Sequence, residues 1–375
     1  MIVGEKIRLY PTKEQEQLFW KFAGAARFTY NTALAHKIDV YQSEGYSCSW
    51  VELLSYMQEL KHSGDYDWLK SIPWSVIKQA VLDLDTAYKR FFQRSNKGFP
   101  KFKKKDKCTP SFYQRPDGFH MIDSYHIKIT GIKDPVRIKW HDAIWQCRNP
   151  RVTYDGKYWY FSYSHDVEDL PKSESDEVIG VDLGIKNLAV TSDGVVYKNI
   201  NKSSRVRQLE KRLRHLQRQV SKKYEENKQG NKYVKTENIH KLEYQIKMIH
   251  RRLKNIRDTY IHQVTYDLVK TKPHCIVIED LNVSGMMKNK HLSKAIQKQE
   301  FYKFRQYLTY KCQFYGVELI VADRFFASSK TCSCCGYKKQ FLSLSERVYI
   351  CPDCGAVIDR DLNAAINLKN YALAQ

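Results

Sequence analysis

The first part of the chain combines a strand-like alternation with three helical patterns of hydrophobic residues. Residues 1–10 alternate between apolar and polar side chains. Thr12 and Gln15 then have the spacing of a capping box, which predicts that a helix begins there. Two further segments follow in which apolar residues recur three and four positions apart. We therefore expect a small helical domain over roughly residues 12–95.

The next stretch, residues 110–165, is typical of antiparallel β-structure. Short runs of β-branched and aromatic residues alternate with turn signals, and Asp155-Gly156 has the sequence of a tight hairpin turn. Because residues 1–10 also predict a strand, we expect the helical domain to be inserted into a β-barrel. A polar linker, residues 171–176, follows, and the composition of the sequence changes after it.

From Glu177 onward the pattern becomes that of an α/β domain. Five short apolar runs predict buried strands, and the first three are close enough to form an antiparallel meander. Two long segments between the third and fourth strands step by three and four, as the seam of a coiled-coil hairpin does. We expect strands at residues 178–182, 187–191, 195–197, 274–279 and 317–321, and helices around 301–310 and at 361–373.

The charge of the chain is strongly positive. Lys and Arg number 63 against 41 Asp and Glu, which gives a formal net charge of +22. A surplus of this size attracts polyanions and says little about the fold. A basic protein without such a partner is the alternative, but the charge is clustered, and this favours nucleic acid.

Two clusters carry much of this charge. Residues 97–107 hold six lysines with two phenylalanines among them, which suits phosphates and stacked bases; a solvated linker is the alternative. Residues 203–257, in the predicted hairpin, hold 17 Lys and Arg against 5 Glu, so their outer faces either line a nucleic-acid channel or are simply solvated. The candidate nucleic-acid contacts are Lys97, Phe99, Lys101, Lys103, Lys104, Lys105, Arg205, Arg212, Arg251 and Arg252.

Cysteine spacing predicts one zinc ion near the C-terminus. Cys332-x-x-Cys335 and Cys351-x-x-Cys354 are separated by fifteen residues, the pattern of a ribbon with four thiolates. Four thiolates leave zinc no open position, so we expect a structural ion; a redox dithiol is the alternative. Cys334 breaks the pattern and is expected to be a spare thiol.

The cysteines and the apolar runs also indicate a compartment. Five of the ten cysteines lie within residues 332–354, which favours a reducing cytosol over a secreted, disulfide-bonded chain. No run of about 18 apolar residues is present, so no membrane span is expected. The first residues predict a strand rather than a signal peptide. A cytoplasmic protein is therefore the expectation.

Three acids stand where a buried strand ends or a helix begins. Asp182 follows Val-Ile-Gly-Val, Glu279 follows Ile-Val-Ile, and Asp361 opens the last helix. An apolar strand has no structural use for a terminal carboxylate unless a cation meets it. Three carboxylates in one α/β unit predict a magnesium site, and a pair of such ions can activate a water and neutralise a scissile phosphate. Capped termini and surface ion pairs are the alternative.

Three neighbouring acids compete for the same role. Asp280 should point to the opposite face of its strand from Glu279. Asp323 is a candidate fourth, auxiliary ligand. Asp359 lies two residues before Asp361 and is the residue most easily mistaken for it.

Four segments that include these residues are typical of one known family. They are Gly180-Val181-Asp182-Leu183-Gly184, Ile276-Val277-Ile278-Glu279-Asp280-Leu281, Ser328-Ser329-Lys330-Thr331-Cys332 and Asp359-Arg360-Asp361-Leu362-Asn363-Ala364-Ala365-Ile366-Asn367. Together with Gly98-Phe99-Pro100-Lys101-Phe102 and the inserted helical domain, they resemble the TnpB family of transposon-encoded, RNA-guided nucleases, which are related to type V CRISPR effectors. The resemblance covers nearly the whole chain. Asp-Leu-Gly alone would be weak, because sugar kinases and actin-like ATPases share it.

The resemblance implies a multidomain α+β fold. An RNase H-like (RuvC) α/β nuclease domain would carry an inserted basic helical hairpin and an inserted zinc ribbon. A wedge-type β-barrel carrying an inserted helical recognition domain would precede it. The implied boundaries are 1–10 and 110–172 for the barrel, 11–109 for the recognition domain, and 177–375 for the nuclease domain, with 203–265 as the hairpin and 328–358 as the ribbon.

The resemblance also implies a function. Asp182, Glu279 and Asp361 would form a catalytic triad that binds two magnesium ions. The partners would be a guide RNA from the transposon end and double-stranded target DNA, cut beside a short target-adjacent motif. We expect a monomer with one RNA, in a prokaryotic cytoplasm and on the nucleoid when bound to DNA.

Two alternative functions remain open. Some relatives have lost a triad acid and act as non-cleaving regulators, and the complete triad here argues against that. A guide-independent, structure-selective RuvC-like nuclease would not need the helical and barrel domains that precede the core.

Overall fold

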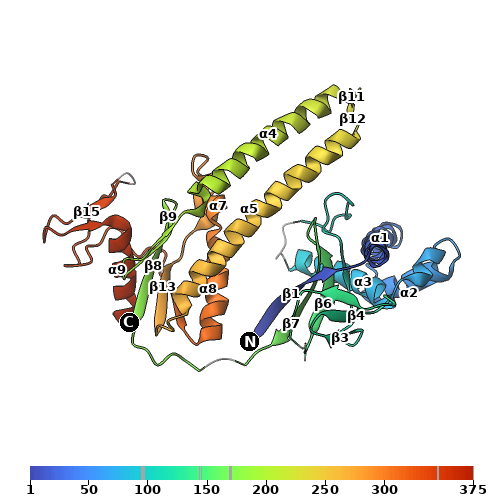
Figure 1. Cartoon of the computed structure of the whole chain (residues 1–375), viewed down its shortest axis with the longest axis horizontal. Helices are drawn as coiled ribbons and strands as arrows, with labels where there is room; N and C mark the ends of the chain where they lie inside the picture. The colour runs from blue at the N-terminus through green and yellow to red at the C-terminus, as the bar shows by residue number, and fades with distance from the viewer. Residues whose placement is uncertain (94–97, 143, 145, 169–170, 344–345, 375) are drawn as a thin grey trace. The chain divides into compact units, whose positions relative to one another are not determined.

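The computed structural model describes residues 1–93, 98–142, 144, 146–168, 171–343 and 346–374 (Figure 1). The chain forms two compact units, Ile2–Val167 and Glu168–Gln375, the second of which includes Met1. Among the helices of the described residues, none combines the length and the apolar character needed to cross a membrane.

The first unit contains the predicted helical block. Its helices are α1 (Lys13–Glu44), α2 (Trp50–His62), the 3-10 helix η1 (Asp67–Ser71) and α3 (Trp74–Phe92). The predicted capping box is confirmed, because the Thr12 hydroxyl accepts from the Gln15 N–H and the Gln15 amide oxygen accepts from the Thr12 N–H. The three predicted helices are thus confirmed.

A seven-stranded sheet of order β2-β6-β7-β1-β5-β4-β3 completes this unit. β1 lies between β7 and β5 and is antiparallel to both, so the helical block is inserted between strands of one sheet, as predicted. Along the described part of the chain the ladder ends at β2 and β3, and its closure into a barrel stays a prediction. The strands are β1 (Ile2–Tyr10), β2 (Ser111–Tyr113), β3 (Phe119–Asp123), β4 (His126–Ile129), β5 (Val136–Ile138), β6 (Arg148–Tyr154) and β7 (Trp159–Asp166).

Aromatic side chains join the helical block to this sheet. Phe19 of α1 lies with its ring centre 5.6 Å from Phe112 of β2 and 5.2 Å from Trp159 of β7. Phe22, one turn further along α1, lies 5.4 Å from Phe112. All four rings are buried, so the helices and the sheet share one hydrophobic core.

The second unit is built on a five-stranded sheet of order β10-β9-β8-β13-β14. The three strands β8, β13 and β14 are parallel neighbours, and β9 and β10 extend the sheet in antiparallel fashion. The predicted meander is confirmed, and each predicted strand end lies within one residue of the observed end. The strands are β8 (Val178–Leu183), β9 (Asn187–Thr191), β10 (Val196–Lys198), β13 (Cys275–Glu279) and β14 (Glu318–Ala322).

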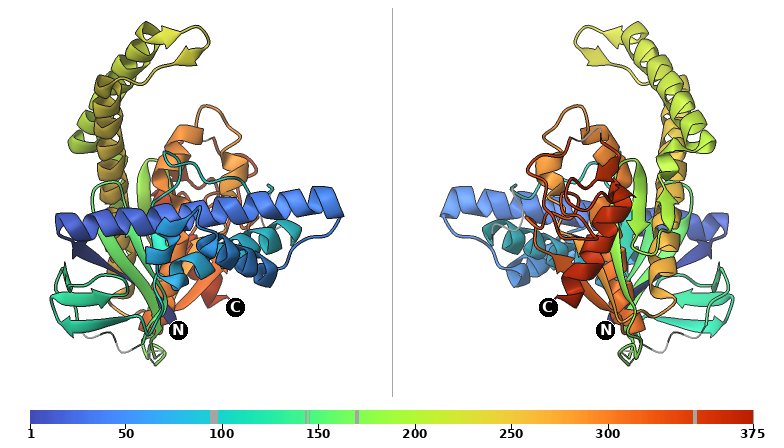
Figure 2. Two further views of the ribbon diagram at one scale, coloured as in Figure 1. Left: turned by 90° about the vertical axis from the view of Figure 1, so that its right-hand side faces the viewer. Right: turned by 90° about the vertical axis from the view of Figure 1, so that its left-hand side faces the viewer.

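Two long helices of this unit form the predicted hairpin, which projects beyond the sheet (Figure 2). Leu213 and Leu216 of the first helix pack with Ile249 and Leu253 of the second along the predicted seam. The second helix then continues into the main core of the unit. The helices of this unit are η2 (Ile200–Lys202), α4 (Ser204–Glu226), α5 (Glu237–Val269), α6 (Val283–Met286), α7 (Ser293–Gln299), α8 (Phe301–Tyr315) and α9 (Arg360–Leu373). Two short ladders pair β11 (Lys228–Gln229) with β12 (Lys232–Tyr233) and β15 (Val348–Ile350) with β16 (Val357–Asp359).

Alternate residues of the five-stranded sheet face two different layers of helices. Ile276 and Ile278 of β13 belong to a core shared with α5 and α8. Val277, between them, belongs to a second core that contains Leu368 of α9. Figure 1 shows α9 on one side of the sheet and α5 and α8 on the other. Glu279, two residues after Val277, therefore lies on the α9 side.

α9 packs closely on β8 at Gly180, which has no side chain to keep the helix away. A Cβ atom at this position would overlap the Ala365 carbonyl oxygen and would lie 2.5 Å from the Lys369 backbone nitrogen. Glycine therefore sets the distance between this helix and the sheet.

Gly180→Ala is expected to destabilise the second unit by about 1–3 kcal/mol, because atoms added to a close-packed layer cost that much. Gly24→Ala in α1 is the control, since nothing lies within 4 Å of its added Cβ. Urea unfolding of both variants measures the effect. An unchanged unfolding transition for Gly180→Ala would contradict the close packing of α9 on β8.

Candidate functional site

Asp182 and Glu279 lie at the ends of two adjacent parallel strands. Val181 of β8 pairs with Ile278 of β13, so the next residues, Asp182 and Glu279, occupy neighbouring positions in the register. Both continue the series of residues that faces α9 rather than the series that faces α5 and α8. The sheet therefore brings two of the three predicted acids together.

Asp361 comes to the same place from α9. It lies in the first turn of that helix, one turn before Ala365, whose carbonyl oxygen packs against Gly180. Its side chain is buried. The charge of Asp361 and, to a smaller extent, that of Asp359 raise the pKa of Asp182, so the start of α9 lies close to the end of β8. The structure thus gathers all three predicted acids.

Burial and like charge both disfavour ionisation at this cluster. Loss of hydration, followed by repulsion from Glu279 and Asp361, raises the pKa of Asp182 well above its ordinary value. Burial also raises the pKa of Glu279. Arg360 lies beside them, with its guanidinium 3.6 Å from the Asp361 carboxylate. A cluster of acids that is costly to ionise gains stability from a bound cation.

The three side chains fit a hard divalent cation. They offer carboxylate oxygens only, the ligands that magnesium prefers, and magnesium binds through few carboxylates while it keeps several waters. Asp182, Glu279 and Asp361 are therefore the residues that would hold magnesium. Their catalytic role stays a prediction.

Asp359, the closest competitor of Asp361, has a different task. Its carboxylate accepts hydrogen bonds from the N–H groups of Asp361 at 2.9 Å and Leu362 at 3.2 Å. It thereby caps the N-terminus of α9. The structure distinguishes the two acids by this hydrogen bonding, which the sequence alone left open.

The other two competitors also have partners elsewhere. Asp280 forms ion pairs with Arg305 at 2.8 Å and with Arg324 at 2.6 Å. Asp323 is exposed, and its carboxylate accepts from the N–H of Phe325 at 2.7 Å. These contacts fix the strand end and the following turn, and an auxiliary metal-binding role for Asp323 stays a prediction.

Ser328 also belongs to the site, although its position in the sequence predicts no role for it. Its side chain is buried, and its hydroxyl donates a hydrogen bond to Glu279. The residue belongs to a segment that resembles the TnpB family. A serine in a loop carries no chemical signal of its own, however, and only the fold shows which carboxylate it meets.

The four cysteines of the predicted ribbon converge. The Sγ–Sγ distances are 3.7 Å between Cys332 and Cys354 and 3.5 Å between Cys335 and Cys351, and all four Sγ atoms lie within 4.8 Å of one another. Zinc–sulfur bonds of about 2.3 Å place the corners of a tetrahedron about 3.8 Å apart, so the cluster fits zinc. Cys334 is exposed and lies outside this cluster, as predicted.

Both cysteine pairs sit in the same kind of turn. The Gly336 N–H bonds to the Cys332 carbonyl at 2.9 Å, and the Gly355 N–H bonds to the Cys351 carbonyl at 3.1 Å. The φ angles are 78° at Gly336 and 72° at Gly355, in the left-handed region that favours glycine. Glycine therefore suits the position after each pair, because other residues rarely adopt this backbone conformation.

The purified chain is expected to contain about one zinc per molecule, because four thiolates make one closed site. Cys354→Ser should lower the zinc content, whereas Cys334→Ser should leave it unchanged. Elemental analysis of the three proteins measures both effects. A folded wild-type protein without zinc, or an equal loss in both variants, would count against the site.

The lysine segment contains an anchored lysine among exposed ones. The Lys103 N–H and carbonyl bond to the Asn31 side-chain amide at 2.7 and 3.0 Å, and its ammonium lies 3.7 Å from the centre of the Tyr30 ring. Burial lowers the pKa of Lys103. These contacts favour a structural role for Lys103, and its phosphate contact stays a prediction. The exposed cations of the described part of the segment are Lys101, Lys104, Lys105 and Lys107.

The aromatic residues of this segment are half exposed. Phe99 packs edge-on against Tyr88 and Phe91, with ring centres 5.4 and 5.5 Å apart, and leaves the remainder of its surface free for stacking. Phe102 is 52% exposed. The predicted contact Lys97 lies outside the described residues.

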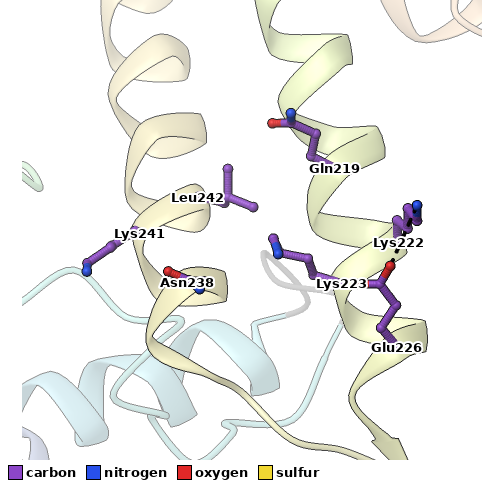
Figure 3. A pocket seen from close by; sticks show the side chains of 7 residues that line it. All are labelled: Gln219, Lys222, Lys223, Glu226, Asn238, Lys241 and Leu242. Carbon is purple, nitrogen blue, oxygen red and sulfur yellow. Dashed lines mark ion pairs between the residues drawn. The ribbon is translucent and has the colours of Figure 1, made fainter.

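The hairpin presents the predicted basic surface. Arg205, Arg212 and Arg252 are exposed, and Arg251 is partly buried. Toward its tip, a notch between α4 and α5 is lined by three lysines, one of which, Lys222, pairs with Glu226 at 3.7 Å (Figure 3). The residues around the notch are Gln219, Lys222, Lys223, Glu226, Asn238, Lys241 and Leu242. Nucleic-acid binding by these faces stays a prediction.

Replacing Lys101, Lys104 and Lys105 together by glutamine is expected to weaken nucleic-acid binding. The slope of log affinity against log salt should fall by about 0.7–0.9 for each phosphate that is no longer neutralised. Lys103→Gln is the matched control, because its ammonium lies on the Tyr30 ring and should leave the slope unchanged. The affinity of each variant for nucleic acid, measured at several salt concentrations, tests this prediction. An unchanged slope in the triple variant would make the segment a solvated linker.

Three known protein families match parts of the chain. Residues 160–290 match a family described as probable transposase, residues 301–368 a Cas12f1-like TNB domain, and residues 1–46 a helix-turn-helix domain. In this structure residues 1–46 form β1 and one continuous helix, α1, rather than two helices joined by a turn.

Two relatives match nearly the full length of the chain, and a third matches about a third of it. A putative RNA-guided DNA endonuclease of Streptomyces pristinaespiralis is 30% identical over 373 residues, which span 98% of this chain and 89% of that protein. The putative RNA-guided DNA endonuclease InsQ of Escherichia coli (strain K12) is 29% identical over a match that spans 97% of this chain and 90% of InsQ. TnpB-like protein L79 of Acanthamoeba polyphaga mimivirus is 33% identical over a match that spans 36% of this chain and 26% of L79.

Solved structures share the fold of the chain at low sequence identity. A Cas12f1–sgRNA–target DNA complex matches with a TM-score of 0.62 and 15% identity, over 96% of this chain and 83% of that one. The mini-RNA-guided endonuclease CRISPR-Cas_phi3 matches with a TM-score of 0.54 and 9% identity, over 100% of this chain and 92% of that one. The multidomain mixed α/β fold expected from the sequence is thereby confirmed. The near full-length match to the Streptomyces protein, together with the match to the probable transposase family, shows that the chain belongs to the TnpB family.

Proposed function

We propose that this chain is a transposon-encoded, RNA-guided DNA endonuclease. Its proposed catalytic residues are Asp182, Glu279 and Asp361. The observation that carries the proposal is the convergence of these acids from β8, β13 and α9, with the pKa of Asp182 raised well above its ordinary value. A cluster of carboxylates that resists ionisation is built to receive cations. In a protein with a strongly basic surface, such cations can meet the phosphate of a bound strand.

Each acid has a task in this proposal. Magnesium, bound as two ions, would supply a Lewis acid that activates a water and neutralises charge on the scissile phosphate. Asp182 and Glu279 hold their places through the register of two parallel strands, and Asp361 through the seating of α9 on Gly180. The Ser328 hydroxyl keeps one oxygen of Glu279 oriented.

The proposed partners are a guide RNA and double-stranded target DNA. The names of the Streptomyces and Escherichia relatives state RNA guidance, and the Cas12f1 structure contains an sgRNA and target DNA. In such complexes base pairing reads the sequence, and the protein holds the backbone. We assign that task here to the basic hairpin and the lysine segment, and recognition of a short target-adjacent motif to the first unit. One RNA per monomer is the proposed stoichiometry.

Zinc has a separate task in this proposal. Four thiolates close its coordination, so the ribbon is structural rather than catalytic. A non-cleaving regulator would not need a complete cluster of acids. A guide-independent nuclease would not need the first unit.

Cleavage of a matched DNA in the presence of magnesium tests the proposal. The purified chain should carry a discrete RNA, and DNA complementary to that RNA should be cut. Asp182→Ala and Asp361→Asn should each lower the rate by more than about 100-fold, since even residues that merely orient metal ligands cost 10–100-fold. Asp359→Asn is the matched control, because asparagine also caps helices and should keep most of the activity.

Two results would contradict this account. Cleavage by Asp182→Ala at the wild-type rate would remove the acids from the chemistry. RNA-free protein that cuts branched DNA regardless of sequence would favour the guide-independent nuclease.

A further inference from the structure

The loop between β14 and the zinc ribbon has an unusual source of hydrogen bonds. Most of residues 323–331 lie outside helices and strands. Three of its carbonyl groups nevertheless accept hydrogen bonds from buried side chains. Asn367 bonds to the Ser328 carbonyl at 2.7 Å, and Tyr349 bonds to the Lys330 carbonyl at 3.1 Å. Buried carbonyl groups need partners, so these donors determine the path of the loop.

Asn363 holds the point where the loop enters the ribbon. Its amide nitrogen donates to the Thr331 carbonyl at 2.7 Å, and its amide oxygen accepts from the Ser333 N–H at 2.9 Å. The two contacts flank Cys332, one of the four cysteines of the zinc cluster. Asn363 is fully buried on α9. The first cysteine is thus tied to the helix that carries Asp361.

Asn367 holds the interior of the same loop as well as its ribbon end. Its amide nitrogen donates to the Thr331 carbonyl at 2.6 Å as well as to the Ser328 carbonyl. Asn367 is 4% exposed and lies one turn after Asn363 on the same face of α9. The Ser328 hydroxyl in turn donates to Glu279. The Asn367 amide therefore holds both Thr331, at the ribbon end of the loop, and Ser328, which contacts Glu279.

The ribbon holds this loop from the opposite side. Tyr349, fully buried in β15, donates from one hydroxyl to the Lys330 carbonyl, and lies within 3.2 Å of the Tyr337 carbonyl in the turn of the first cysteine pair. β15 leads directly to Cys351, so the position of Tyr349 depends on the folded ribbon. Without zinc the four thiols lose the ion that joins the two halves of the ribbon.

We propose that Asn363 and Asn367 are positioning residues that couple the zinc ribbon to the acidic site, so that bound zinc sets the affinity of that site for divalent cations. The inference rests on the proposed function, since it takes the acids as the metal site. The coupling passes from Cys332 through Asn363, the Thr331 carbonyl, Asn367 and Ser328 to Glu279. Zinc thereby does more than stabilise the ribbon: it orients an acid that it does not touch.

The coupling has a thermodynamic consequence. If zinc increases the affinity of the acidic site for a divalent cation, the cation increases the affinity of the ribbon for zinc by the same factor. Residues that orient metal ligands typically change metal affinity by about 10–100-fold. A ribbon that was only a rigid appendage would produce no such change.

Direct titration with Mn²⁺ tests the proposal. The full-length chain, freed of nucleic acid at high salt, is titrated while free Mn²⁺ is measured by electron paramagnetic resonance. The variants are Asn363→Leu, Asn367→Leu, Ser328→Ala and a zinc-free Cys332→Ser/Cys335→Ser double variant. Asn370→Leu is the matched control, because Asn370 is an exposed asparagine of the same helix. Circular dichroism and zinc analysis accompany each titration.

The asparagine variants, Ser328→Ala and the zinc-free variant should each weaken Mn²⁺ binding by about 10–100-fold. Asn370→Leu should bind as the wild type does, and Asp182→Ala should lose the site. Wild-type affinity in the folded zinc-free variant, or in Ser328→Ala, would overturn the coupling. Should the asparagine variants fail to fold, the zinc-free variant and Ser328→Ala, which removes a single hydroxyl, decide together.

The two proposals fail in different ways. If Asp182→Ala lowers Mn²⁺ affinity but the zinc-free variant does not, only the coupling is wrong. If Asp182→Ala binds Mn²⁺ as tightly as the wild type, the acidic site is wrong, and the proposed function falls with it.

Discussion

The close approach of α9 to β8 is the contact on which the site depends. Gly180 allows the helix backbone to lie directly on the strand, and this contact places Asp361 beside Asp182. The same helix covers the sheet through Leu368 and fixes the ribbon loop through two buried asparagines. Packing, the proposed metal site and loop geometry therefore share one short helix. A shift of α9 would affect all three together.

Two opposite electrostatic environments follow from this arrangement. The hairpin and the lysine segment concentrate positive charge at exposed positions, where it attracts phosphates at little desolvation cost. The acids concentrate negative charge in a poorly hydrated place, where ionisation is costly until a cation binds. A strand of nucleic acid is thus attracted by one surface and repelled by the other. A metal ion is what makes the acids compatible with a phosphate.

Much of the second unit was predictable because local and global signals agree there. Apolar runs of strand length, each bounded by a turn or an acid, gave the strand ends to within one residue. The cysteine spacing gave the ribbon for a similar reason: zinc geometry fixes the sequence pattern. The acids at the strand ends stood out because a carboxylate after an apolar strand has few structural uses. Their convergence followed from parallel strands ending at one edge of a sheet.

The remaining features depend on contacts between distant residues. Asp359 and Asp361 are equivalent as sequence signals at a helix start, and only the hydrogen bonds of Asp359 to the helix end show which one is the cap. Lys103 looked like its neighbours, but it is anchored by Asn31, 72 positions away. The roles of Ser328 and of the two asparagines depend equally on partners that no local pattern reveals.

The central claim is that Asp182, Glu279 and Asp361 form one divalent-cation site, and crystals grown with Mn²⁺ test it most directly. Anomalous diffraction would locate the metal independently of any activity. We expect a peak among the carboxylates of these three residues, with Asp359 still bonded to the start of α9. A peak on Asp359 or Asp323 instead, or an empty acid cluster in crystals that bind Mn²⁺ elsewhere, would contradict it.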